Sequence, residues 1–206
     1  PSIDGLSFDS PNPAGPIVYP NDATGWPGDN IAGITPISAI VAINGVTNGM
    51  TIGAFNALDI TLTILTITGA VDLVDANIAF YQTQISTASP NSLGDITKIQ
   101  GMVNDANTAA INAAAGVATP APAITLAQLQ AVVGANAINA NLAVYRAAIA
   151  NAGADSLTTM ALIQTLVDGV NAAVINAAAS GGDTSLANAI TLAQLQAVVG
   201  ANAISA

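Results

Sequence analysis

The chain has 206 residues, a formal net charge of −10, and no histidine, cysteine or glutamate. It therefore lacks the side chains for a Ser-His-Asp or Cys-His catalytic group, for a disulfide framework or for a thiolate zinc site. Its basic side chains, Lys98 and Arg146, are too few for the phosphate contacts on which nucleic-acid binding depends, so we expect no nucleic acid as a partner.

Apolar residues make up 52% of the chain, but charged residues only 7%. The best apolar window, residues 37–46, is interrupted by Asn44 and Gly45. It is also shorter than the roughly 18–20 residues of a spanning helix, so we expect no membrane insertion. A surface of neutral Asn, Thr, Ser and Gln side chains packs against copies of itself at little electrostatic cost. The expected partner is therefore the chain itself, as a homo-oligomer or polymer.

Residues 1–55 are predicted to form an extended or irregular arm, with short β structure as an alternative. Proline and glycine are dense through Trp26-Pro27-Gly28, and these residues favour turns and loops. Such an arm cannot bury itself alone, so we expect it to lie along its own chain or on a neighbouring molecule. Trp26 is the candidate anchor for that docking; a local turn plug is the competing interpretation.

The stretch NDATGWPGDN at residues 21–30 contains the one candidate cofactor site. Asp22, Asp29 and Asn30 offer the oxygen ligands that calcium prefers. The spacing does not match an EF-hand loop, and a plain turn is the competing interpretation. Apart from this calcium candidate, we expect no cofactor.

Residues 60–68, ITLTILTIT, are ambiguous. Alternating β-branched residues favour a strand. The alternating threonines resemble ice-binding arrays, which makes an ice-binding surface protein a minor functional alternative. The register of this segment with ITLAQLQAV at residues 124–132 favours a helix.

An internal repeat is the strongest signal in the sequence. The fifteen residues ITLAQLQAVVGANAI occur at 124–138 and again, without a difference, at 190–204. A more diverged copy lies upstream, because residues 60–116 align with 124–180 at 22 identical positions out of 57. Tyr81 and Tyr145 occupy one repeat position, where we predict that both pack in the core.

The repeat unit is predicted to contain three helices. The first begins at an N-cap, Thr125, and ends at Gly134. The second runs from about residue 136 to 151, and the third begins after a cap at Asp155 or Ser156 and ends at residues 180–182. The apolar stripes at helical spacing are Leu126, Leu129 and Val133; Ile138, Leu142, Tyr145 and Ile149; and Leu157, Met160, Ile163, Val167, Val170 and Val174.

The predicted fold is therefore mainly α, with tandem three-helix repeats of about 65 residues after an N-terminal arm. The expected boundaries are 1–55 for the arm, 56–119 and 120–185 for two repeats, and 186–206 for a partial third repeat. The helix near 191–199 has no bundle of its own to complete, so we expect it to make contacts between subunits. Its candidate assembly residues are Leu192, Leu195 and Val199.

Enzymatic chemistry is not expected. Acid–base catalysis would fall to Asp, Tyr and one Lys. Pairs such as Asp72 and Asp75 are better explained as solvated or capping side chains. No glycine-rich phosphate loop or dinucleotide fingerprint is present.

The segments ITLAQLQAVVGANAINANLAVYRAAIANAG and SLTTMALIQTLVDGVNAAVINAAASGG resemble tandem-repeat bacterial surface proteins, namely type I-secreted adhesins and S-layer proteins. The resemblance is one of Ala/Asn/Thr-rich composition and repeat style, and it covers residues 60–206. It implies a location outside the cell or on the cell surface, in a bacterium.

Together these observations predict an extracellular structural protein that self-assembles into a filament or surface lattice. Its arm and its partial third repeat would make the contacts. The alternative is a stalk or binding segment of a large secreted adhesin. The sequence names no further surface ligand.

Overall fold

The structure, a computed structural model, describes residues 2–3, 6–7, 35–47, 57–118, 123–180 and 190–199. This part of the chain is mainly helical, as predicted. It divides into two compact units, Pro1–Ala106 and Asn107–Ala206, and the boundary falls inside helix α4 (Ile96–Asn112). Each unit has its own hydrophobic core.

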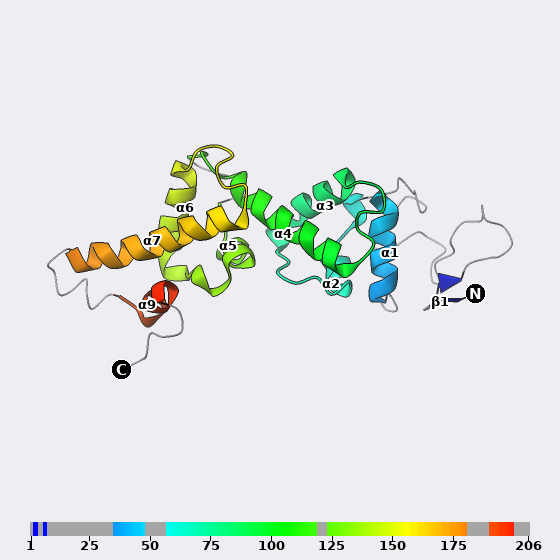
Figure 1. The fold of residues 1–206 in the computed structure, drawn as a ribbon, viewed down its shortest axis with the longest axis horizontal. Helices are drawn as coiled ribbons and strands as arrows, with labels where there is room; N and C mark the ends of the chain where they lie inside the picture. The colour runs from blue at the N-terminus through cyan, green and yellow to red at the C-terminus, as the bar shows by residue number, and fades with distance from the viewer. Residues whose placement is uncertain are drawn as a thin grey trace. The chain divides into compact units, whose positions relative to one another are not determined.

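The first unit opens with two antiparallel strands, β1 (Ser2–Ile3) and β2 (Leu6–Ser7). The helices and 3-10 turns that follow are α1 (Pro36–Thr47), η1 (Ala57–Asp59), α2 (Leu62–Ile67), η2 (Asp75–Asn77), α3 (Ile78–Thr87) and the first part of α4. Helix α1 contacts α2 and α3 (Figure 1). Fully buried side chains from each of these helices, Ile43, Ile64, Tyr81 and Ile99, meet in one core.

The second unit begins with the end of α4. Its remaining elements are α5 (Leu126–Val133), η3 (Gly134–Asn136), η4 (Asn139–Asn141), α6 (Leu142–Asn151), α7 (Met160–Ser180) and α9 (Leu192–Val199). Helices α5 and α6 both pack on α7. The core of this unit joins the end of α4 to the three helices that follow, through Ile111, Leu129, Tyr145 and Ile163.

The short helices begin as the sequence predicts. Thr125 caps α5, since its hydroxyl accepts a hydrogen bond from the Gln128 backbone N–H at 3.2 Å. The Gln128 side-chain oxygen accepts from the Thr125 backbone N–H at 2.8 Å, which completes a capping box. Gly134 ends the helix with a φ of 60°, a conformation that favours glycine. Residues 62–67 form α2 with Thr61 as N-cap, so the helical interpretation of this segment is confirmed and its threonines do not line a strand.

Three expectations are wrong in detail. Residues 36–47 of the predicted arm form α1, because small apolar residues recur there at helical spacing and bury one face. Helix α6 begins at Leu142, after two 3-10 turns, and not near residue 136. The hydroxyl of Thr159 caps α7 at 3.3 Å from the Leu162 N–H, in place of Asp155 or Ser156.

Helix α7 is the one helix in the described ranges that is long and apolar enough to cross a membrane by length and composition. In its apolar window, 22% is buried inside the structure. Buried Asn171 lies within it, and the absence of membrane insertion stays a prediction.

Candidate assembly site

The identical sequences of α5 and α9 lie in different environments. In α5, Leu129 is 0% exposed and Val132 is 8% exposed. In α9, the corresponding Leu195 is 41% exposed and Val198 is 44% exposed. Because the two sequences are the same, the difference comes from their surroundings. The face that α5 buries in the core of the second unit is exposed to solvent in α9.

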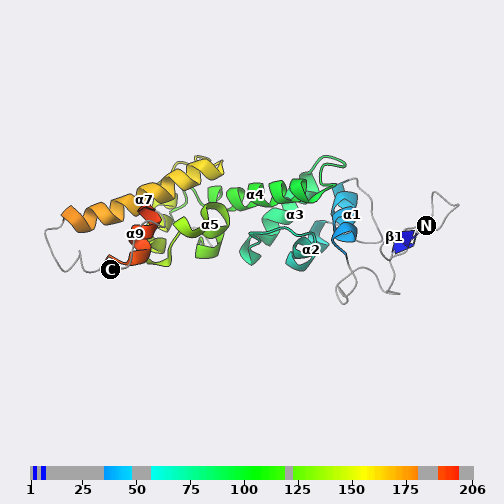
Figure 2. The ribbon, with the colours of Figure 1, turned by 60° about the horizontal axis from the view of Figure 1, so that its bottom comes forward.

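Helix α9 sits on α7 through its other side (Figures 1 and 2). Gln194 and Ala197 are buried in this contact. The Gln194 side-chain amide donates a hydrogen bond to Asn141 Oδ1 at 3.1 Å. A polar contact therefore holds α9 in place, while Leu192, Leu195 and Val198 point away from it with 39–44% of their surface exposed.

The Gln194 contact continues into a buried chain of polar side chains. Asn141 Nδ2 donates to Asn171 Oδ1 at 2.8 Å, and the Tyr145 hydroxyl bonds to the same oxygen. Asn171 Nδ2 in turn donates to the Asn136 carbonyl at 2.9 Å. Each amide is used as both donor and acceptor, so the burial leaves these groups satisfied. Tyr81 and Tyr145 are both 0% exposed, which confirms their predicted place in the core.

A second polar contact recurs in both units, and we call it the asparagine clamp. In the first unit, Asn44 Oδ1 accepts from the Leu93 backbone N–H at 3.1 Å, and Asn44 Nδ2 donates to Asn91 Oδ1 at 3.4 Å. The clamp ties the end of α1 to the loop between α3 and α4. The loop residue Asn91 has a φ of 61°, and Leu93 behind it is buried.

In the second unit the same clamp ties the end of α4 to the loop between α6 and α7. Asn112 Oδ1 accepts from the Leu157 N–H at 2.9 Å, and Asn112 Nδ2 donates to Asp155 Oδ1 at 3.2 Å. Asp155 has a φ of 56°, which corresponds to that of Asn91. Helix α1 therefore does for the first unit what the end of α4 does for the second.

The clamp residues were not predicted from the sequence. The triplet Ala-Ile-Asn occurs at 42–44 and at 110–112, which are 68 rather than 64 residues apart. The different spacing placed the first copy inside the predicted arm. The triplet also occurs at 137–139, at the start of η4, so it does not by itself identify a clamp.

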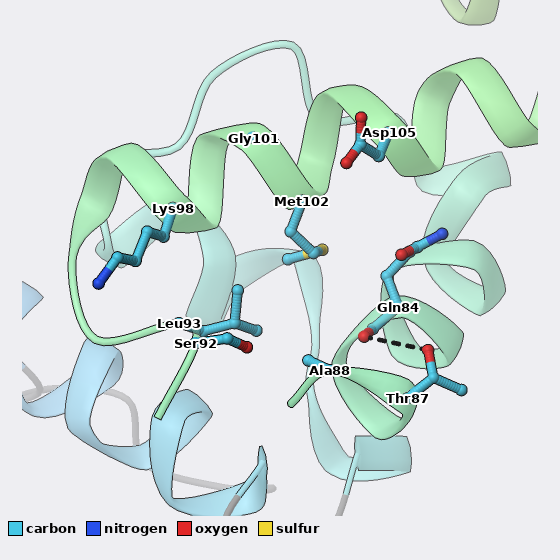
Figure 3. Close-up of a pocket in the computed structure, with 9 residues that line it drawn as sticks. All are labelled: Gln84, Thr87, Ala88, Ser92, Leu93, Lys98, Gly101, Met102 and Asp105. Atoms are coloured by element: carbon cyan, nitrogen blue, oxygen red, sulfur yellow. Dashed lines mark hydrogen bonds between the residues drawn. The ribbon is translucent and has the colours of Figure 1, made fainter. Parts of the chain in front are cut away.

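A shallow groove of about 320 Å³ lies on the first unit between α3 and α4 (Figure 3). Lys98 and Asp105 are its charged side chains. Lys98 forms an exposed ion pair with Asp95 at 3.3 Å, and the Lys98 backbone N–H, more than its ammonium group, lowers the pKa of Asp95. The repeat positions that correspond to Lys98 and Asp105 in the second unit are Leu162 and Gly169. The charged side chains of the groove therefore have no charged equivalents in the second unit. The exposed ion pair of Lys98 with Asp95 is typical of a solvated surface.

The predicted site residues fall in three groups. Leu192 and Leu195 lie on the exposed face of α9. Val199 ends that helix, and its side chain lies outside the described part. Trp26 and the calcium candidates Asp22, Asp29 and Asn30 also lie outside the described residues. Among the residues that are described, no three acidic side chains gather into a metal-binding group.

Comparison with known proteins adds no relative. No protein-family model matches the sequence, no curated protein matches it, and no solved structure matches its fold.

Proposed function

We propose that this protein is an extracellular structural protein, built of tandem helical repeats of about 65 residues, that self-assembles into a filament or surface lattice through its N-terminal arm, which includes α1, and its partial third repeat. The observation that carries the proposal is the exposed apolar face of α9. A sequence that buries this face in one copy presents it to solvent in the other. Contiguous exposed apolar side chains on a folded protein mark contact surfaces.

A second exposed apolar face supports the same proposal. On α1, Ile37 and Val41 point outward and are 53% and 41% exposed. When the helices are aligned on their clamp asparagines, the positions that correspond to Ile37 in α4 and α7 hold Asp105 and Gly169. The large apolar residues on α1 are therefore not a requirement of the repeat. They place large exposed apolar side chains at positions where α4 and α7 have none, while the start of α7 exposes Met160 and Leu162.

Neither face contains a charged side chain. Helices α1 and α9 have no acidic residue in their first turn and no basic residue in their last. Contact between such faces requires no desolvation of charge. Two different faces on one chain also favour head-to-tail contacts, which generate open filaments when the rotation between copies does not close a ring.

The test compares assembly of the chain with that of two charge variants. Leu195→Asp and Ile37→Asp each place a carboxylate in an exposed apolar face, on α9 and α1 respectively. The control Thr165→Asp places a carboxylate at an exposed site on α7, away from both faces. Light scattering and negative-stain microscopy at rising concentration should show assemblies for the parent chain and for Thr165→Asp. The particles formed by Leu195→Asp and Ile37→Asp should remain small at every concentration. Monomeric behaviour of the parent at high concentration would contradict self-assembly.

A stalk within a large adhesin is the second candidate, and the recurrence of the asparagine clamp favours it. Contacts that repeat between successive segments build elongated, quasi-one-dimensional arrays, and such an array can hold a binding domain away from the cell surface. A stalk would appear in micrographs as isolated rods, without lateral or end-to-end association.

A further inference from the structure

The end of α7 repeats the residues that form the clamp on α1 and α4. Ile175 and Asn176 correspond to Ile111 and Asn112, within the run INAAA found at 111–115 and 175–179. Ile43 and Ile111 are both 0% exposed. Ile175, in contrast, is partly exposed, and Asn176 is exposed. Within the part of the chain that the structure describes, the Asn176 side chain makes no hydrogen bond.

The end of α7 and the exposed face of α9 belong together. In the second unit, their counterparts are the end of α4 and the apolar face of α5. Ile111 from the first and Leu129 from the second lie in a single core with Tyr145, Leu157 and Ile163. These last three side chains come from α6, from α7 and from the loop between them. A helix–loop–helix therefore covers both surfaces at once in the second unit.

We infer that the end of α7 and the exposed face of α9 form one docking site, and that its occupant is a further helix–loop–helix of the same chemistry as residues 139–180. The inference rests on the proposal that the exposed faces of α1 and α9 are contact surfaces, and it names what the α9 surface accepts. Asn176 would hold the loop of the occupant as Asn112 holds residues 155–157.

The clamp specifies what the occupant must contain. Both loops that are held have the sequence Asx-Ser-Leu, namely Asn91-Ser92-Leu93 and Asp155-Ser156-Leu157. The first residue adopts a positive φ and offers its side-chain oxygen, and the third offers its backbone N–H and a buried side chain. The occupant also needs an apolar stripe to cover Leu192, Leu195 and Val198. Lipid or nucleic acid offers neither the loop geometry nor the amide donors.

The chain itself provides the probe. Residues 124–138 and 190–204 are identical, so a copy of residues 139–180 joined after Ile204 restores the sequence that follows α5. Hydrogen exchange at the α9 amides is measured in the full chain with and without this extension. We expect exchange in α9 to slow by about tenfold or more, because docking places the helix in a cooperative unit. Circular dichroism should show the added residues to be helical.

The variant Asn176→Ala separates a specific clamp from general apolar contact. In the extended chain it should reverse most of the added protection, whereas in the chain of 206 residues it should leave α9 exchange and stability unchanged. Asn151→Ala, which removes an exposed asparagine at the end of α6, is the matched control and should have no effect in either chain.

Two results would overturn the inference. An extension that stays unfolded, or leaves α9 exchange unchanged, would show that the site does not accept this module. Protection that survives Asn176→Ala would show that Asn176 is not part of the site. Protection of α9 that appears in the unextended chain only at high protein concentration, and is lost in Asn176→Ala, would instead support the inference, with a second copy supplying the module as the proposed self-assembly requires. Failure of self-assembly would leave the extension experiment informative.

Discussion

The two copies of one helix allow the same substitution to be made in two environments. Leu129 and Leu195 have identical neighbours along the chain for several residues on either side. Leu129 is 0% exposed and packs in the core of the second unit, whereas Leu195 is 41% exposed. Differences in helix propensity and in the unfolded chain therefore cancel when Leu129→Ala is compared with Leu195→Ala.

The magnitudes follow from burial. Removing a fully buried leucine side chain costs about 2–5 kcal/mol, because the transfer term is joined by a cavity that the surroundings fill only in part. Leu195 loses only contacts that are already partial, at about 0.8 kcal/mol per buried methylene, and leaves no enclosed cavity. We expect Leu195→Ala to cost about 1 kcal/mol or less, so the two variants should differ by at least about 1 kcal/mol.

The measurement is urea unfolding of the full chain followed by circular dichroism, with hydrogen exchange in α6 to report on the second unit separately. The order should reverse for assembly: Leu195→Ala should weaken association, and Leu129→Ala should act only through stability. Equal losses of stability would mean that the face of α9 is buried in solution, and the argument for a contact surface would then fail.

Three further predictions concern polar groups. Tyr145→Phe removes the hydroxyl that bonds to Asn171 and accepts from the Ile138 N–H at 3.4 Å, so the free energy of unfolding should fall by about 1–3 kcal/mol, measured by urea unfolding. Asn112→Ala leaves the Leu157 N–H without its partner and should cost a similar amount, detected as faster exchange at that amide. Asp95 accepts the Lys98 N–H at 3.0 Å and its pKa is lowered. Its contribution to the start of α4 is therefore present at neutral pH and lost as the pH falls through the folded pKa, and a carboxyl NMR titration with a pKa at or above the ordinary Asp value would contradict this.

Much of the helical pattern could be predicted because it depends on local residues. Thr125 and Gly134 bracket α5 through backbone bonds within a few residues, and the stripe from Tyr145 to Ile149 reflects one face of α6. The start of α7 could not be placed, since Asp155, Ser156 and Thr159 are all competent caps. The choice is made by Asn112, which is 43 residues away from Asp155 in sequence and holds it in a left-handed turn.

The candidate site was predictable in part for the same reason. The repeat pointed to Leu192 and Leu195, because they occupy the positions of Leu126 and Leu129 in the apolar stripe of the preceding copy. The asparagine clamp could not be predicted, since asparagine is common in this chain and the hydrogen-bond partners of the clamp residues lie in loops far away in the sequence. Helix α1 was missed because its buried face combines Ile43 with small or polar residues such as Ser38 and Ala39. Its exposed face carries large apolar residues, Ile37 and Val41, so the two faces differ little in hydrophobicity.

A neutral clamp explains why asparagine, and not aspartate, lies near the ends of these helices. The side-chain amide both accepts from a backbone N–H and donates to a loop oxygen, which no carboxylate does. In the second unit the loop oxygen belongs to Asp155, whereas in the first it belongs to Asn91. Asn112→Asp therefore places two carboxylates in contact at neutral pH, but Asn44→Asp places its new charge beside a neutral amide.

The two isosteric variants should accordingly differ in sign of pH dependence. Asn112→Asp should lose stability at neutral pH and regain part of it as the pH falls to about 4, where one carboxylate of a close pair takes up a proton. Asn44→Asp should change the free energy of unfolding little at pH 7 and lower it on acidification. Protonation weakens the new carboxylate as an acceptor for the Leu93 N–H and the Asn91 amide. Urea unfolding of both variants at pH 7 and pH 4 measures the difference. If the stabilities of the two variants change with pH in the same direction, the clamp does not involve Asp155. The inferred role of Asn176 would then lose its structural basis.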